Sequence, residues 1–139
     1  MTDFRLVYYS ENRIPPDRLE SEIEKILTAS RKNNLLVGIS GALMFNAGYF
    51  AQVLEGTQPA IESTFERIQQ DRRHGNVHLL EFTAAPARAF QTWSMAFIGP
   101  SGKVSPSLST VASRSGFDPR NLDGVQLFGR LRDLLDDPD

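Results

Sequence analysis

Apolar and polar residues alternate over residues 4–10, with the period of two that is typical of a strand. One face of this strand would carry Phe4, Leu6 and Tyr8, and the other would carry Arg5, Val7 and Tyr9. The segment Pro15-Pro16-Asp17 then provides a favourable helix start, because proline is tolerated in the first helical turn. The helix that follows is expected to end near Asn33-Asn34, and its apolar stripe consists of Leu19, Ile23, Ile26 and Leu27.

A β-hairpin and a second helix are expected next. Residues 37–45 predict a strand in which Gly38 and Gly41 would leave open space on the face above them. Residues 46–48 tolerate positive φ and would form a turn, so residues 49–54 return as the hairpin partner. Ile61, Phe65 and Ile68 form the apolar face of a helix that begins at Pro59 and ends at about residue 71.

Two further strands, at residues 77–82 and 91–97, complete the order βαββαββ. This order predicts a ferredoxin-like α+β sandwich, in which a five-stranded mixed sheet carries two helices on one face. The segment 99–116 is rich in Ser, Gly and Pro, and a short helix could open at Ser105-Pro106. A final helix is expected over residues 119–136.

The final helix has an apolar stripe that must be buried, made of Leu127, Phe128, Leu131, Leu134 and Leu135. We expect it to cover the sheet face that carries Val7 and Tyr9, and a dimer interface is the alternative. The chain is therefore divided into a domain at residues 1–98 and a linker with a C-terminal helical cap at residues 99–139.

Composition narrows the classes of function. The 139 residues suit one compact domain with a short appendage, and 40% hydrophobic residues suffice for a packed core. A net charge of −2 argues against a broad electrostatic contact with nucleic acid. The absence of cysteine excludes disulfides, thiolate metal sites and cysteine nucleophiles. With no signal-peptide pattern and no apolar window of about 20 residues, we expect a cytoplasmic protein without membrane contact.

Two polar residues occupy positions that the strand pattern predicts to be buried. Gln52 lies between Phe50 and Leu54 on one strand face, and Tyr8 lies on the apolar face of the first strand. A buried carboxamide or phenol that lacks a partner costs about 1–3 kcal/mol per group. Tyr8 and Gln52 therefore either bond each other or the backbone and merely stabilise the core, or they serve a ligand.

Polar residues at the helix ends have ordinary structural explanations when taken singly. Asn34 could be a C-cap, and Arg67 with Asp71 could form an i,i+4 ion pair on the second helix. Positive charge at the C-terminal end of a helix interacts favourably with the helix dipole, and the residues expected there are Arg72, Arg73 and His74. Catalytic candidates are scarce, because the two histidines assemble no metal set and no serine lies in a nucleophile context. The sequence therefore does not indicate an enzyme.

Six segments resemble, in the same order, the BLUF photoreceptors, which sense blue light with flavin adenine dinucleotide (FAD). They cover roughly residues 4–98, and each alone is a weak signal. They are LVYYS (6–10), SRKNN (30–34), GISGAL (38–43), FAQVLEG (50–56), IQQDRRH (68–74) and WSM (93–95). The family's fold agrees with the predicted sandwich.

The resemblance implies a noncovalently bound FAD whose ring lies between the two helices and over the sheet. By this resemblance, Tyr8 is the light-driven electron and proton donor, and Gln52 bridges it to the N5 and O4 edge of the flavin. Asn34 matches the residue that holds the carbonyl and N3 edge. The switch residues of the last strand correspond to Trp93 and Met95.

The expected cofactor contacts form a larger set: Tyr8, Ile26, Asn33, Asn34, Gln52, Arg67, Asp71, Arg73 and His74. Two departures from the family pattern are a slightly longer span between Tyr8 and Asn34, assigned to the loop at residues 12–16, and a second tyrosine, Tyr9. Strand alternation directs Tyr9 to the opposite face.

The tail resembles no effector domain, so we expect a stand-alone sensor. Its output would pass through an unidentified protein partner or through self-association as a homodimer or higher oligomer. Two alternatives use the same sandwich: a ligand-binding or protein-interaction module without photochemistry, and an acylphosphatase-like or oxidoreductase enzyme.

Overall fold

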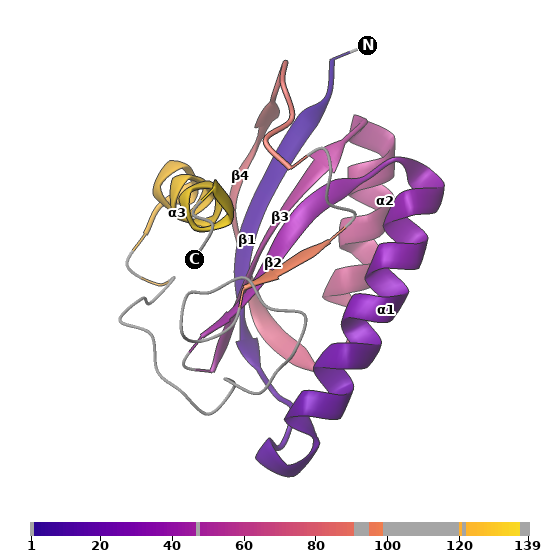
Figure 1. The fold of residues 1–139 in the computed structure, drawn as a ribbon, viewed down its shortest axis with the longest axis vertical. Helices are drawn as coiled ribbons and strands as arrows, with labels where there is room; N and C mark the ends of the chain where they lie inside the picture. The colour runs from indigo at the N-terminus through magenta and orange to yellow at the C-terminus, as the bar shows by residue number, and fades with distance from the viewer. Residues whose placement is uncertain (1, 47, 91–94, 99–119, 121, 137–139) are drawn as a thin grey trace.

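The computed structural model describes residues 2–46, 48–90, 95–98, 120 and 122–136 (Figure 1). Its strands are β1 (Phe4–Asn12), β2 (Ser40–Asn46), β3 (Tyr49–Gly56), β4 (His74–Ala84) and β5 (Ala96–Ile98). Its α-helices are α1 (Leu19–Val37), α2 (Gln58–Gln69) and α3 (Gly124–Asp136). A 3-10 turn at Pro16–Arg18 precedes α1. The expected helix at residue 105 and the expected strand residues 91–94 lie outside the described residues.

The strands form one five-stranded sheet in the order β4-β1-β3-β2-β5. β1 is antiparallel to both of its neighbours, and β2 is antiparallel to β3. β5 pairs in parallel with β2, which makes the sheet mixed. The unit β1-α1-β2 is a split βαβ with β3 between its strands. The predicted ferredoxin-like α+β sandwich is confirmed.

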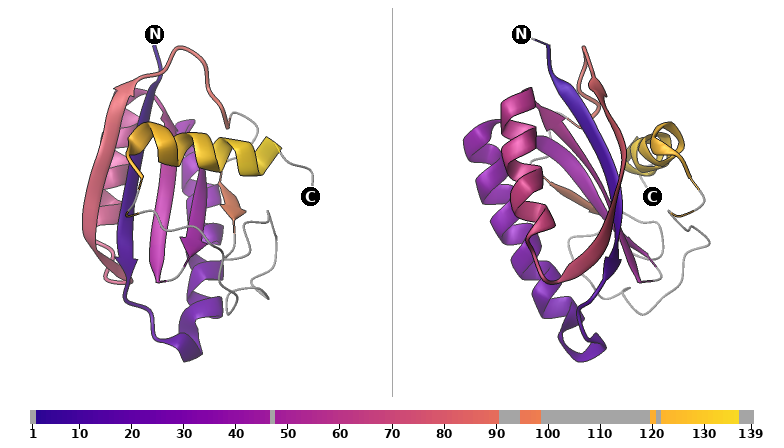
Figure 2. Two further views of the ribbon diagram at one scale, coloured as in Figure 1. Left: turned by 90° about the vertical axis from the view of Figure 1, so that its left-hand side faces the viewer. Right: turned by 180° about the vertical axis from the view of Figure 1, so that it is seen from behind.

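The two faces of the sheet are covered by different helices (Figure 2), and each face has its own core of buried residues. α1 and α2 cover one face, where Leu6 and Tyr8 of β1 are buried. α3 crosses the other face, where Leu127 and Leu131 pack with Val7. The alternation predicted for β1 and the burial of the final helix on the sheet are therefore both confirmed.

α1 continues beyond its expected end, as far as Val37. Gly38 caps it with φ of 72°, and the Gly38 N–H donates to the Asn34 carbonyl. Glycine adopts this left-handed conformation without the steric cost that a Cβ would bring. The prediction that Asn34 is the C-cap is therefore wrong. Asn34 lies one turn inside the helix and is 2% exposed.

α2 ends earlier than expected. Thr57 caps its start by accepting the Ala60 N–H at 3.4 Å, and its last residue is Gln69. The Asp71 side chain then accepts the Arg73 N–H at 2.9 Å, a local turn that competes with helix continuation. His74 consequently begins β4 instead of ending the helix. The predicted Arg67–Asp71 ion pair is wrong, because Asp71 pairs with Arg73.

Gly41 does not leave open space, contrary to the expectation for the second strand. A Cβ at this position would lie 2.0 Å from the Val53 carbonyl oxygen, so the glycine permits close approach of β2 to β3. Gly38, the other glycine of that prediction, lies before β2.

Among the described residues, no helix is long and apolar enough to cross a bilayer.

Candidate functional site

A cavity of about 200 Å³, partly open to solvent, lies among α1, α2 and the sheet face that they cover. Every residue for which the sequence predicts a cofactor contact lines it: Tyr8, Ile26, Asn33, Asn34, Gln52, Arg67, Asp71, Arg73 and His74. These residues come from β1, α1, β3, α2, the turn after α2 and the first residue of β4. The fold thus brings together side chains that are far apart in the sequence.

A bonded chain of three side chains crosses the sheet beside this cavity. Tyr8 and Gln52 lie directly opposite each other in the β1–β3 ladder. The Tyr8 hydroxyl donates to Gln52 Oε1, and Gln52 Nε2 donates to the Met95 sulfur at 3.4 Å. All three side chains are at most 4% exposed. Gln52 is therefore the connection between the phenol and the residue that precedes β5.

The Tyr8 phenol is held in its protonated form. Burial raises the pKa of Tyr8 well above its usual range, and the negative charge of Asp71 adds to this shift. The ring packs against Phe65 with centroids 5.3 Å apart. Tyr8 thus keeps its proton and can donate a hydrogen bond at any physiological pH.

Helical spacing directs one face of α1 toward the cavity. Ile26, Ser30 and Asn34 recur at intervals of four residues, and each lines the cavity. Asn33, beside Asn34, also lines it. The apolar face that packs on the sheet is adjacent and includes Ile23 and Leu27. The longer course of α1 is what places the Asn34 carboxamide within this wall.

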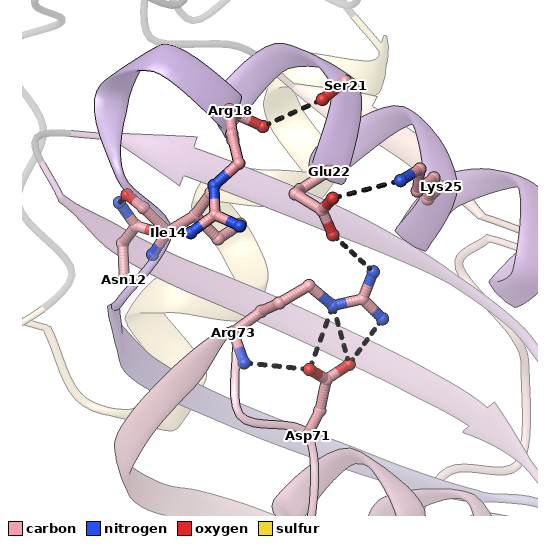
Figure 3. Close-up of polar contacts among 8 residues, drawn as sticks. All are labelled: Asn12, Ile14, Arg18, Ser21, Glu22, Lys25, Asp71 and Arg73. Carbon is pink, nitrogen blue, oxygen red and sulfur yellow. Dashed lines mark hydrogen bonds and ion pairs between the residues drawn. The ribbon is translucent and has the colours of Figure 1, made fainter.

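A charged bridge spans the gap between α1 and the turn after α2 (Figure 3). Arg73 Nη2 lies 2.8 Å from Asp71 Oδ2, and Arg73 Nη1 lies 3.5 Å from Glu22 Oε1 of α1. Lys25 also contacts Glu22, at 3.2 Å. The hydrogen bond from Arg73 lowers the pKa of Asp71, and that from Lys25 lowers the pKa of Glu22. The bridge therefore links α1 to the turn after α2 at one end of the cavity.

Residues of α2 supply the opposite wall. Thr64 is buried and lines the cavity together with Arg67 and Ile68. In the described part of the chain, no carboxylate pairs with the Arg67 guanidinium. Arg67 is thus a cationic donor that a ligand in the cavity could engage.

His74 joins β1 to the end of α2. Its Nδ1 lies 2.6 Å from the Ser10 hydroxyl and its Nε2 lies 2.6 Å from the Ile68 carbonyl oxygen. Since the carbonyl can only accept, Nε2 carries a proton. Both ring nitrogens are engaged within the protein, so any contact of His74 with a ligand is made by the faces or carbons of its ring.

Some residues at the site lay outside the sequence prediction. Ser30 and Thr64 line the cavity, and their signal was their helical spacing from Asn34 and Arg67. Arg31 Nε donates to the Met95 carbonyl at 2.9 Å, a contact that no spacing could indicate. Trp93, the other predicted switch residue, lies outside the described residues.

The donor set fits a flavin ring. Ile26 and Ile68 from the two helices, with Leu43 and Leu54 from the sheet, provide apolar walls suited to a flat aromatic system. The carboxamides of Asn34 and Gln52 can each donate and accept, which matches a ring edge that carries both carbonyls and ring nitrogens. The phenol of Tyr8 also lines the cavity and is hydrogen-bonded to Gln52 Oε1.

Comparison with known proteins identifies the class of this domain. The family model described as BLUF, sensors of blue-light using FAD, matches residues 4–96. The chain therefore belongs to the BLUF family of flavin-based blue-light sensors.

The chain resembles several solved structures over nearly its whole length. It matches BlsA in its photo-activated state with a TM-score of 0.79 and 32% identity, over 96% of this chain and 94% of that one. It matches BlrB, a BLUF protein in its dark state, with a TM-score of 0.76 and 26% identity, over 96% and 95% of the two chains.

Curated relatives are longer proteins. The blue light- and temperature-regulated antirepressor BluF of Escherichia coli is 34% identical over 85 residues, which are 61% of this chain and 21% of that protein. The photoactivated adenylate cyclase subunit beta of Euglena longa is 29% identical over 66% of this chain and 11% of its own length. This chain thus spans about a fifth or less of these relatives.

Proposed function

We propose that this protein is a blue-light photoreceptor that holds FAD noncovalently in the cavity between α1 and α2. The observation that carries the proposal is the chain Tyr8–Gln52–Met95 beside that cavity. Family membership supports a flavin, and the family's description names FAD. A BlrP1 structure from Klebsiella pneumoniae, 27% identical to this chain, was obtained with FMN, so FMN is the competing flavin to test.

The proposed photochemistry uses groups that are already hydrogen-bonded. A bound flavin supplies the absorption of blue light and an excited state that accepts one electron. Tyr8, as the donor of that electron, becomes strongly acidic, and its proton can move along the existing bond to Gln52 Oε1. When the electron and proton return, the Gln52 carboxamide is left rotated or in its imidic tautomer. No substrate is consumed, so the cycle is a switch and not a turnover.

The change at Gln52 provides an output. Rotation places Oε1 where the Nε2–H donor now faces the Met95 sulfur, and tautomerisation leaves Nε2 with a single N–H, so either change can break the present bond to Met95. Met95 immediately precedes β5, which is an edge strand of the sheet. We propose that the signal passes from there to the C-terminal helical cap at residues 99–139, and then to a protein partner or a second copy of the chain. The cyclase activity named for the Euglena relatives is not proposed here, because the match covers only 11% of that protein.

The experiment is an absorption spectrum of the purified FAD-loaded protein before and after blue illumination. We expect a small red shift that reverses in the dark. Tyr8→Phe should retain FAD and lose the shift, and Gln52→Leu should bind FAD with altered absorption and no normal switching.

Tyr9→Phe is the matched control, because Tyr9 lies on the opposite sheet face and packs on the His78 ring. It should behave like the parent protein. A protein that binds FAD but shows no light-induced shift would be a ligand-binding module without photochemistry. A protein that takes up no flavin would overturn the proposal as a whole.

A further inference from the structure

A second buried polar cluster lies on the sheet face away from the flavin cavity. Glu55 of β3 is 0% exposed, although its side chain is an acid. Its Oε2 accepts from Arg5 Nε at 3.0 Å and from the Ala89 N–H at 3.0 Å, and its Oε1 accepts from the Phe90 N–H at 2.9 Å. A buried carboxylate requires such a full set of donors. Glu55 thereby fastens the connection between β4 and β5 to the centre of the sheet.

Two of the three residues that Glu55 binds, Arg5 and Phe90, also contact one aromatic ring of the cap helix α3. The Arg5 guanidinium carbon lies 3.8 Å from the centroid of the Phe128 ring. The Phe90 ring meets Phe128 edge-on, with centroids 5.9 Å apart and an interplanar angle of 85°. Phe128 is thus held between the cation and the ring that Glu55 positions.

Glu55 lies three residues from Gln52 on β3, and strand alternation places them on opposite faces. Gln52 bonds to Met95 on the helix-covered face, and Glu55 bonds to Ala89 and Phe90 on the α3 face. The same strand therefore holds the chain at two points ahead of β5. A displacement of that chain relative to β3 would alter the Glu55 bonds and shift the Phe90 ring against Phe128.

We propose that Glu55 is the positioning residue that couples α3 to the chain leading into β5, so that loss of the Gln52–Met95 contact in the light loosens α3 on the sheet. This inference rests on the proposed function for its light-dependent part. Its static part, the dependence of α3 packing on Glu55, stands on the contacts above.

Hydrogen exchange of the α3 amides, measured on the full FAD-loaded chain in the dark and under blue light, tests this coupling. Glu55→Gln keeps the side-chain shape but removes the charge that holds Arg5. Phe128→Leu keeps an apolar contact and removes the ring. Glu62→Gln, an exposed position on α2, is the matched control.

In the dark, Glu55→Gln and Phe128→Leu should raise α3 exchange by about tenfold, while Glu62→Gln should leave it unchanged. In the parent protein, light should raise α3 exchange about threefold or more, a change that both coupling variants lose while they keep the spectral red shift. If Glu55→Gln fails to fold, Phe128→Leu alone provides the same comparison.

Three results would overturn the coupling. The first is dark exchange of α3 that is the same in the parent protein and both coupling variants. The second is a light-dependent change in α3 exchange that persists in those variants. The third is a parent protein that shows the red shift without any light-dependent change in α3 exchange. Loss of the red shift itself in the parent protein would instead refute the proposed photoreception, and the dark comparison would still decide whether Glu55 positions α3.

Discussion

The bond between Tyr8 and Gln52 should be measurable as a coupling energy in a double-mutant cycle. Tyr8→Phe leaves Gln52 Oε1 without its donor, and Gln52→Leu leaves the Tyr8 hydroxyl without its acceptor, with both groups buried. An unsatisfied buried group costs about 1–3 kcal/mol, whereas replacing both partners by apolar groups of similar shape is nearly neutral. Each single variant should therefore lose about 2 kcal/mol of unfolding free energy, and the double variant should lose less than the sum of the two.

Urea unfolding in the dark, without added flavin and again at saturating FAD, provides the assay, because binding to the folded state adds its own stabilisation. With a denaturant dependence of about 2 kcal/mol per molar urea, each single change should lower the midpoint by about 1 M. Tyr9→Phe should produce a much smaller shift. Additive losses in the double variant, at either FAD concentration, would show that the two groups are not coupled and would refute this reasoning.

Three further predictions concern the charged bridge, the β2–β3 contact and the switch residue. Because Arg73 holds the pKa of Asp71 below its ordinary value of 3.8, the bridge stabilises the fold above that pH and is lost as the pH falls through the lowered value. Asp71→Asn should therefore flatten the acid limb of unfolding free energy against pH, and an unchanged limb would contradict this assignment. Gly41→Ala should lower the unfolding free energy by about 3 kcal/mol through its contact with the Val53 carbonyl. In Gly38→Ala the new Cβ would meet open space, and only the positive φ would be strained, so this variant should lose about 1 kcal/mol of unfolding free energy in the same urea assay. Equal losses in Gly41→Ala and Gly38→Ala would argue against the clash with the Val53 carbonyl. Met95→Leu should keep the red shift and change the rate of dark recovery, followed by absorbance, by less than about tenfold, because it removes one weak bond. Loss of the shift in Met95→Leu would mean that the sulfur is part of the photochemical step itself.

The sequence predicted those features that depend on local periodicity. Alternation in β1 correctly separated Tyr8 from Tyr9, and the apolar stripe of the final helix correctly predicted its burial on the sheet. The pairing of Tyr8 with Gln52 was one of two open interpretations, because spacing cannot show which buried polar groups meet. The register of β1 with β3 places the two residues opposite each other, and their side chains are hydrogen-bonded.

Other features depended on competition between local signals or on distant partners. Asn34 and Gly38 are both residues that end helices, and only the left-handed backbone at Gly38 shows which one ends α1. The sequence around Asp71 is compatible with an ion pair to Arg67 and also with a local turn in which the Asp71 side chain accepts the Arg73 N–H. The structure has the turn. Glu55 in a strand would be expected at the surface, and its burial depends on N–H groups more than 30 residues further along the chain.

The most direct test of the central claim is the light-minus-dark absorption spectrum of the FAD-loaded protein, recorded side by side for the parent, Tyr8→Phe and Tyr9→Phe. Our account predicts a reversible red shift in the parent and in Tyr9→Phe, and none in Tyr8→Phe despite bound flavin. A full shift in Tyr8→Phe, or no shift in a flavin-loaded parent protein, would contradict it.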